Sequence, residues 1–402
     1  MRVLVYPHAM EIGGSQLNAV QLAGAVRDLG HEVIVLSEPG PMVDRVHALD
    51  LEHIEIPMLR GWPSARIART LVRVVRDRRI DLVHGYEWGP VMEAFFGPKL
   101  RCGTPVVGTI MAMTVEWSFP RAIHLIVGTE ELRETAIAGG RSKITLLEPP
   151  VDTDSDDPAL VDGREFRKTH GIRDDELLVV IVSRLASALK LEGLLTACDA
   201  VGELARSQRV RLVIVGGGPM HDQVAAQAAA ANATAGRQAV LLAGEMADPR
   251  TAYAAADIVI GMGGSALRAL AFGKPLIVIG EDGFSEILTP ASVSRFLKQG
   301  WYGTGPGSLG AGAPALGMAL QQLTNSADLR RDLSASARQL VIDRFSLHRA
   351  AKLQEHIYLS AIDDRTSLFE QAKDFAYTAT GVSGRILRRQ YPSFAKTPPP
   401  LH

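Results

Sequence analysis

Two cations follow one apolar run of this chain closely enough to hold a single anion between them. Arg184 follows the run at 177–182 after one serine, and Lys190 lies in the same segment, before a helical stretch. Two fixed cations suit a diphosphate, and they offset the negative charge that develops on a phosphate as it leaves during group transfer. The competing interpretation is a pair of solvated surface charges, because most arginines and lysines are simply exposed.

Three other segments that follow apolar runs contain neighbouring glycines, which let a backbone approach an anion closely. The first precedes Ser15, a favourable N-cap residue. It lacks the GxGxxG spacing of a nicotinamide site, and an ordinary strand-to-helix turn explains it equally well. The last opens a predicted helix, whose free N–H groups and dipole favour an anion. The anion-binding candidates in these segments are Gly13, Gly14, Gly216, Gly218, Gly263, Gly264, Ser265 and Ala266.

Two polar residues in the first half of the chain are candidates to orient a hydroxyl group. His8 comes after the apolar run at 3–6, and Glu87 comes after the run at 81–83. A side chain that simply caps a loop is the competing interpretation. Asp152-Thr153-Asp154 has the Asp-x-Asp spacing of some manganese sites. We reject a metal site there, because the motif lies in an acidic segment and not at the end of a strand.

The elements that would position these residues are alternating strands and helices. Continuous apolar runs predict strands that are buried on both faces, as in parallel sheets covered by helices. The runs form two series, so we expect two α/β domains of the Rossmann-like type, with ligands at the carboxyl ends of the strands. The runs lie at 3–6, 33–36, 81–83, 105–107, 124–127, 177–182, 211–215, 240–242, 257–260 and 275–279.

The predicted domain boundary lies near Asp162, in the acidic and proline-containing segment 151–163. We expect a first domain over 1–162 and a second domain over 163–345. C-terminal helices over 346–402 would return toward the first domain and end in a disordered, proline-rich tail. The glycine-rich segment that starts at Tyr302 is predicted to be a mobile loop that leads into a helix.

Composition excludes several classes of protein. Hydrophobic residues make up 47% and charged residues 22%, as in folded globular chains, and the net charge of -1 gives no general attraction to nucleic acid. Cys102 and Cys198 are too few for a disulfide framework or a four-thiolate metal site. Together with a start that lacks a secretion signal, they favour a cytoplasmic protein. The helix at 64–78 carries arginines on one side, which indicates a solvated face or a peripheral contact with anionic lipid.

Taken in order, these segments resemble the retaining GT-B glycosyltransferases, in particular the large family-four group, from residue 1 to about residue 360. Each motif is short, and the series is what carries the resemblance. After the N-terminal glycine pair, the motifs are Arg-Leu with a following lysine and glycine (Arg184, Lys190, Gly193), a GxGP turn (Gly216, Gly218, Pro219) and an AxGKP helix exit (Ala271, Gly273, Lys274, Pro275).

The resemblance implies a nucleoside diphosphate sugar as co-substrate, held by the second domain. The first domain would present a hydroxyl acceptor such as a natural product, lipid or glycan, with the chemistry in a cleft between the domains. Arg184 and Lys190 would be the catalytic residues that bind the diphosphate. The family is metal-independent, has no tightly bound cofactor and works by front-face displacement, in which the leaving phosphate helps to remove the acceptor proton. No nucleophile–base pair is then required, and the sequence contains no convincing one.

The chain departs from the family at several positions. The family's paired glutamates would fall on Ile260 and Arg268. The second glutamate holds the ribose of the nucleotide, so Arg268 must act differently, for example by contacting phosphate. Glu286 or Glu281 would then hold the ribose. The family's histidine near the donor sugar is replaced by Met111, which we keep as an acceptor-side candidate.

These departures leave two alternatives open. One is a catalytically impaired partner or scaffold that binds nucleotide sugars. The other is an epimerase or phosphorylase with the same fold, which converts or releases the donor sugar without an acceptor alcohol. Binding of a nucleotide sugar, with or without transfer to an acceptor, distinguishes these functions, because fold alone does not.

Overall fold

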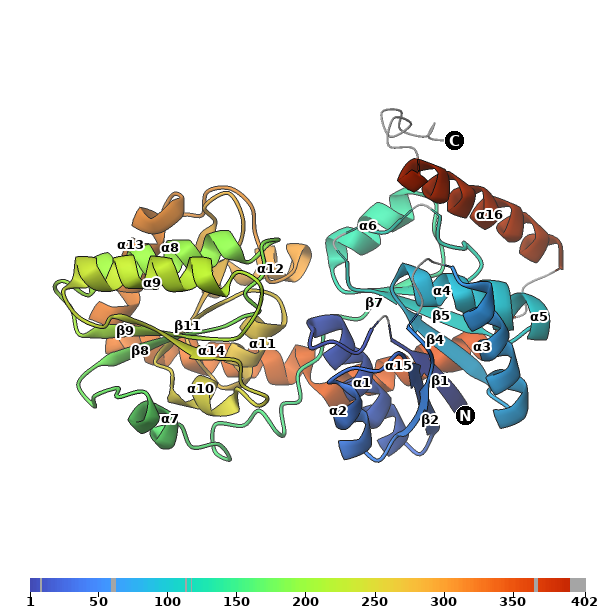
Figure 1. The fold of residues 1–402 in the computed structure, drawn as a ribbon, viewed down its shortest axis with the longest axis horizontal. Helices are drawn as coiled ribbons and strands as arrows, with labels where there is room; N and C mark the ends of the chain where they lie inside the picture. Colours follow the sequence, from blue (N-terminus) through green and yellow to red (C-terminus); the bar gives the residue numbers. More distant parts are fainter. Residues whose placement is uncertain (8, 59–62, 113, 117, 365–367, 391–402) are drawn as a thin grey trace. The chain divides into compact units, whose positions relative to one another are not determined.

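The computed structural model describes residues 1–390 apart from 8, 59–62, 113, 117 and 365–367, and apart from the side chains of 368–371 and 385–390. They form two compact units (Figure 1). The first unit contains Met1–Glu148 and the chain from Leu347, and the second contains Pro149–Ser346. The acidic segment near Asp162 belongs to the second unit, where the Val151 N–H donates to the Phe345 carbonyl at 2.8 Å. The division therefore comes before this segment and not within it.

The first unit is built on a seven-stranded sheet with the strand order β3-β2-β1-β4-β5-β6-β7. All of its pairings are parallel. The central strands are buried along nearly their whole length, as expected when helices cover both faces of a sheet. The strands are β1 (Arg2–Tyr6), β2 (Glu32–Ser37), β3 (Glu52–Glu55), β4 (Leu82–Tyr86), β5 (Val106–Ile110), β6 (His124–Val127) and β7 (Ile144–Leu146).

Two clusters of buried side chains lie on the faces of this sheet, one formed with α1 and α15 and the other with α3 and α4. α15 is fixed by its Tyr358 hydroxyl, which lies 2.6 Å from Nδ1 of the buried His84. Burial lowers the pKa of His84 to about 3, so the ring is neutral in this contact. The predicted proline-rich tail, 391–402, lies outside the described residues. The helices are α1 (Gly14–Asp28), α2 (Val43–Ala48), α3 (Ala65–Arg78), α4 (Trp88–Ala94), the π-helical η1 (Phe95–Lys99), α5 (Leu100–Cys102), α6 (Glu130–Ala138), α15 (Leu347–Asp363) and α16 (Leu368–Gln390).

The second unit has a six-stranded sheet in the order β10-β9-β8-β11-β12-β13. Its pairings are parallel except that β13 runs antiparallel to β12. The strands are β8 (Leu177–Val182), β9 (Val210–Val215), β10 (Val240–Gly244), β11 (Ile258–Gly261), β12 (Leu276–Ile279) and β13 (Ser285–Ile287).

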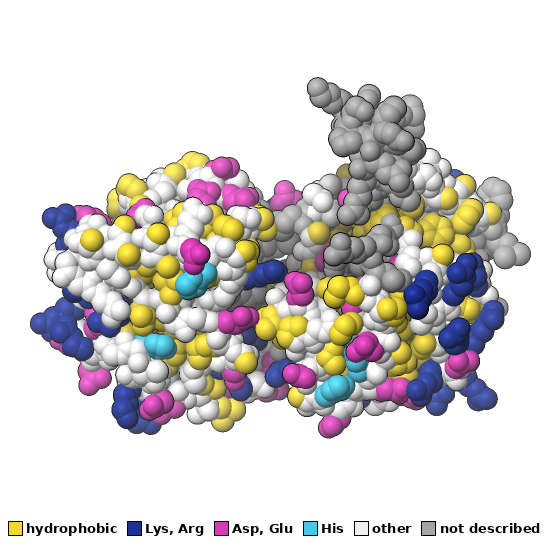
Figure 2. Space-filling view, in the orientation of Figure 1, with side chains coloured by type: hydrophobic (Ala, Val, Ile, Leu, Met, Phe, Trp, Pro, Cys, Tyr) yellow, Lys and Arg dark blue, Asp and Glu magenta, His cyan; other side chains and the backbone are white. Residues whose placement is uncertain are grey.

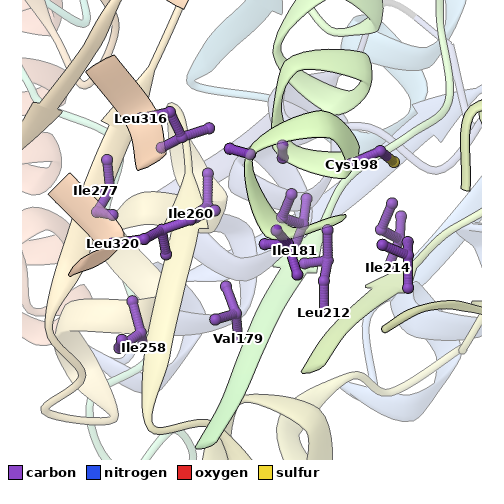
Figure 3. Close-up of a cluster of buried hydrophobic side chains, with 14 of the residues drawn as sticks. Val179, Ile181, Cys198, Leu212, Ile214, Ile258, Ile260, Ile277, Leu316 and Leu320 are labelled. Atoms are coloured by element: carbon purple, nitrogen blue, oxygen red, sulfur yellow. The ribbon is translucent and has the colours of Figure 1, made fainter. Parts of the chain in front are cut away.

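Helices cover this second sheet as well. Figure 3 shows aliphatic side chains of β8, β9, β11 and β12 packed against Cys198 of α8 and against Leu316 and Leu320 of α13. Ile260 of β11 is one of these core residues and is fully buried. The helices are α7 (Arg164–Thr169), α8 (Leu191–Leu204), α9 (His221–Ala235), α10 (Arg250–Ala255), α11 (Gly264–Ala271), α12 (Val293–Gln299), α13 (Gly312–Asn325) and α14 (Ala327–Phe345).

The architecture confirms the predicted fold class, two α/β units with mostly parallel sheets. All the apolar runs named in the sequence form strands. The strands that the sequence did not predict, β3, β7 and β13, each lie at the edge of a sheet. Edge strands are less buried than central ones, so they need no continuous apolar run.

The glycine-rich segment after Tyr302 is held in place, whereas the sequence predicts a mobile loop. The Tyr302 hydroxyl donates to the Glu281 carboxylate, and the Glu281 N–H donates to the Gly303 carbonyl at 3.0 Å. The Ser308 N–H and hydroxyl donate to Glu286 at 2.7 and 2.6 Å. Two carboxylates thus anchor the segment that precedes α13.

Among the described residues, each helix is too short or too polar to cross a lipid bilayer.

Candidate functional site

Each sheet has a point at which the chain continues in opposite directions from two neighbouring strands. In the second unit, β8 leads through α8 to β9 on one side and pairs with β11 on the other. Open α/β sheets bind ligands beyond the carboxyl ends of the strands at such a switch point. The segments 183–190 and 262–263, which follow β8 and β11, therefore border the candidate site of the second unit.

Lys190 is a partly buried cation at the start of α8. Burial lowers the pKa of its ammonium group to about 8. None of the carboxylates that the structure describes forms an ion pair with it. A desolvated charge without a compensating partner favours the arrival of an anion. Arg184, in the same segment, is exposed to solvent.

The N-terminus of α11 lies at the other side of this switch point. Gly263 has a φ of 56°, which favours glycine, and its N–H donates to the Trp301 carbonyl at 2.6 Å. The next three N–H groups, those of Gly264, Ser265 and Ala266, have no acceptor among the described residues. The Ser265 hydroxyl turns back to the Met262 carbonyl, and the Ala266 side chain is buried. Three backbone donors and the helix dipole are thus available to an anion.

Gly216 and Gly218, predicted to border an anion, are packed closely against a neighbouring segment of the chain. Both have a φ near 148°, and a Cβ on either would collide with a backbone carbonyl, that of Ser183 or that of Leu185. These glycines let the turn after β9 pack against the segment that contains Arg184. The structure therefore gives a packing reason for glycine at both positions, and they support the cationic segment.

Arg268 is neutralised within the chain. Its Nε lies 2.8 Å from Oδ2 of Asp156, whose side chain is only 2% exposed. Burial raises the pKa of Asp156, and the guanidinium of Arg268 opposes that shift. The sequence suggested phosphate as a partner of Arg268, which remains a prediction; in the structure Arg268 fixes the segment that follows the division between the units. Asp156 was not foreseen, because nothing in the local sequence pairs it with a residue so far along the chain.

Glu286 and Ile260 are also engaged in the fold. Both carboxylate oxygens of Glu286 accept hydrogen bonds from Ser308, so its expected contact with ribose would have to compete with them. The Ile260 side chain lies in the core. A glutamate at position 260 would lie in the core and not at the carboxyl ends of the strands. Its replacement by isoleucine therefore removes no polar group from the candidate site.

The switch point of the first unit lies between β1 and β4, and it brings several predicted residues together. Glu87 follows β4 with φ 64° and ψ 177°, a conformation rarely adopted by residues other than glycine. Its Oε1 accepts from the Met111 N–H at 3.0 Å and from the Ser15 hydroxyl at 3.4 Å. Burial raises the pKa of Glu87, against the effect of these hydrogen bonds. Gly13 and Gly14 border the same group, since α1 begins beside them.

Ser15 does not cap α1 as predicted. The N-cap residue is Gly13, and no side chain caps the helix. The Ser15 hydroxyl is directed instead to Glu87, a contact that the sequence did not reveal because the two residues lie in different motifs. His8, the other polar candidate of this unit, lies outside the described residues.

The rejected Asp-x-Asp motif has a local role. The Asp152 carboxylate accepts from the Ser155 N–H at 3.0 Å, which stabilises a turn. In the part of the chain that the structure describes, no three histidine, cysteine, aspartate or glutamate side chains are grouped to hold a metal ion.

Two mostly parallel sheets, each with a switch point that collects polar groups, are the architecture expected of a GT-B glycosyltransferase, and the comparisons with known proteins assign the chain to that class. Residues 12–155 match the family model Glycosyltransferase Family 4, and residues 162–306 match Glycosyl transferases group 1. The chain belongs to the family-4-like GT-B glycosyltransferases. No curated protein matches the chain.

Solved structures share this fold over most of their length. A glycosyltransferase from Rickettsia africae superposes with a TM-score of 0.73 at 18% identity, covering 90% of this chain and 99% of that one. HepE of Anabaena in complex with UDP-glucose superposes with a TM-score of 0.68 at 14% identity, covering 90% and 100%. MnaA of S. aureus with UDP has a TM-score of 0.59 at 13% identity, covering 91% and 99%.

Proposed function

We propose that this enzyme transfers a sugar from a nucleoside diphosphate sugar to a hydroxyl acceptor, with retention of configuration and without a metal ion. The observation that carries the donor assignment is Lys190, a partly buried cation with no described carboxylate beside it, across the switch point from the open N–H groups of α11. A diphosphate supplies the negative charge that both features require. Solved structures of the same fold hold UDP or UDP-glucose.

In the proposed reaction, the bond between the anomeric carbon and the phosphate oxygen breaks, and a bond to the acceptor oxygen forms on the same face of the sugar. The acceptor proton passes to the leaving phosphate. Lys190 and Arg184 stabilise the charge that develops on this phosphate, and the N–H groups of Gly264 and Ser265 hold it in place. Retention is supported by the family resemblance.

We assign acceptor binding to the switch point of the first unit, around Glu87 and Met111. Gly14 supports this assignment, because its backbone angles are ordinary and a Cβ there would meet no atom within 4 Å. Nothing in the fold of the described residues requires glycine at this position. Close approach of a ligand does explain it, whether from the acceptor or from the donor sugar.

We also propose that the enzyme acts in the cytoplasm and contacts an anionic membrane surface through α3. Arg66, Arg69, Arg73 and Arg76 are exposed on this helix, and the described residues include no carboxylate paired with any of them. Figure 2 shows basic side chains gathered on this side of the first unit. Each basic residue near an anionic bilayer contributes about 1 kcal/mol of attraction. Binding to phosphatidylserine vesicles that disappears at high salt supports this contact, and equal binding to neutral vesicles argues against it.

A thermal-shift panel of nucleoside diphosphates and their sugars tests the donor assignment. Ligand at about 100 times its Kd adds roughly 2.7 kcal/mol to stability, which is enough for a visible rise in Tm. We expect one nucleotide to raise the Tm equally with chelator and with added magnesium, and its sugar to be transferred in an assay with candidate acceptors. Binding without transfer would favour the impaired partner. Conversion of the donor without an acceptor alcohol would favour an epimerase or phosphorylase.

A further inference from the structure

Glu192, in the first turn of α8, holds this helix to the turn between β12 and β13. Its Oε2 accepts from the Asp282 N–H at 3.0 Å, and its Oε1 accepts from the Gly283 N–H at 2.6 Å. Both residues of the turn have a positive φ, 55° and 79°, and their successive N–H groups meet the same carboxylate. Hydrogen bonds to an ionised carboxylate are stronger than those between neutral groups, and two of them fix its orientation. Glu192 therefore joins the segments that follow β8 and β12.

Lys190 lies two residues before Glu192 and is the N-cap residue of α8. The preceding residue, Leu189, has a φ of 65°, a conformation that residues other than glycine adopt only rarely. Such a conformation persists only where the surrounding contacts determine it. The hydrogen bonds of Glu192 supply one such contact. A second comes from Gly193, where a Cβ would lie 2.7 Å from Cδ1 of Ile279 in β12. The start of α8, and with it the backbone of Lys190, is thus fixed on the end of β12.

The hydrogen bonds of Glu192 also affect the charge at this position. Glu192 is the carboxylate nearest to Lys190 along the chain, and a free glutamate so close could neutralise the cation. In the structure both of its oxygens accept from backbone N–H groups, and Lys190 and Glu192 form no ion pair with each other. The turn at Asp282 and Gly283 therefore binds the carboxylate that would otherwise compete with an arriving anion.

We propose that Glu192 is a positioning residue for sugar transfer, which keeps Lys190 in place beyond the strand ends and available to the diphosphate of the donor. This proposal rests on the proposed transferase function and adds a residue that does not itself touch the substrate. Because Glu192 acts through Lys190, its contribution to transfer depends on the presence of that cation.

A double-mutant cycle tests this dependence. Glu192→Gln keeps the size of the side chain but leaves one oxygen to accept from two N–H groups. It should lower kcat/KM for sugar transfer by about threefold to tenfold, the size expected for the loss of one hydrogen bond, with the acceptor KM unchanged. In the Lys190→Ala background the same substitution should change kcat/KM by less than about twofold, because the cation that it positions is gone. Equal reductions in the two backgrounds would overturn the proposal, since a merely structural role gives that result. Wild-type kcat/KM in Glu192→Gln would overturn it as well.

Two further variants complete the experiment. Glu192→Asp keeps the charge on a shorter side chain and should recover part of the activity that Glu192→Gln loses. Glu203→Gln replaces an exposed glutamate in the last turn of the same helix, and as the matched control it should transfer sugar like the wild type. Activity of Glu192→Asp below that of Glu192→Gln would contradict a role for the carboxylate. A wild-type protein whose Tm rises with none of the nucleotides or their sugars would instead contradict the proposed function.

Discussion

At the switch point of the first sheet, the segment after β4 carries a carboxylate, Glu87. At the switch point of the second sheet, the segment after β8 carries a cation, Lys190. Both side chains are partly buried. Burial raises the pKa of Glu87 and lowers the pKa of Lys190, which in each case favours the neutral form. A helix that begins with glycine, α1 or α11, lies beside each of them. In our proposal the common topology provides a binding position in both units. The sign of one side chain then selects a hydrogen-bond donor in one unit and an anion in the other.

The glycines in the segments that follow the strands of the two sheets are of two kinds. Gly14 and Gly264 have ordinary backbone angles and empty space where a Cβ would be. Gly216 and Gly218 have backbone carbonyls in that space. In our proposal a ligand accounts for the first kind, and packing accounts for the second, although a glycine motif in the sequence looks the same in both cases.

Removal of Lys190, the cation in the segment that follows β8, has the largest expected effect on sugar transfer. Lys190→Ala should lower kcat/KM for sugar transfer by roughly 10²–10³, the usual result of losing one preorganised charge contact. Arg184→Ala should have an effect of the same order. Steady-state kinetics measures both, with Lys168→Ala, an exposed lysine of α7, as the control. Turnover that stays at the wild-type level in both variants would refute the diphosphate assignment.

The positions of Lys190 and Glu87 relative to the strands could be predicted from the sequence, because the local pattern of apolar residues marks each strand and the segment that follows it. The apolar runs locate the strands, and polar residues in the segments that follow them, such as Lys190 and Glu87, then fall beyond the carboxyl ends of the strands. Contacts between distant segments could not be predicted. The pairs Arg268 with Asp156 and Glu286 with Ser308 depend on how loops meet in space, and neither partner is marked by a motif. For the same reason the sequence placed the division between the units near Asp162, whereas the contacts of Val151 with Phe345 and of Asp156 with Arg268 hold the acidic segment in the second unit.

Arg268 is a second cation of the same unit, and unlike Lys190 it is paired with a carboxylate. Asp156→Asn keeps the shape and removes the charge that neutralises Arg268, so it should lower the free energy of unfolding by about 2 kcal/mol, below the range for fully buried pairs because Arg268 is partly exposed. Urea denaturation measures this, and Asp154→Asn, an exposed aspartate in the same segment, is the control. Arg268→Ala should leave nucleotide affinity nearly unchanged. A loss of affinity comparable to that of Lys190→Ala would mean that Arg268 serves phosphate after all.

The two kinds of glycine predict opposite results for the same substitution. Gly264→Ala and Gly14→Ala should preserve or slightly raise the Tm, because alanine favours a helix, and should lower transfer by about tenfold, as expected when a ligand loses close backbone approach. Gly216→Ala should lower the Tm through its collision with the Ser183 carbonyl. If Gly264→Ala and Gly14→Ala were fully active, close approach of a ligand would no longer explain these glycines.

The smallest expected effect is a dependence of donor affinity on pH, which tests whether Lys190 acts through its charge. Its pKa of about 8 means that the free enzyme loses this cation as the pH rises through 8. The diphosphate of an intact nucleotide sugar has no titration in this range, so its affinity should fall about threefold to fivefold between roughly pH 7 and pH 8.5. Lys190→Arg remains charged and should show no such fall, and Lys190→Ala should bind weakly at every pH.

Stability without ligand should change in the opposite sense. Above pH 8 the unfolded lysine binds more protons than the folded one, so the free energy of unfolding should rise toward pH 10.5 in the wild type and not in Lys190→Arg. Parallel affinity curves for wild type and Lys190→Arg would show that the ammonium of Lys190 does not titrate at the donor site.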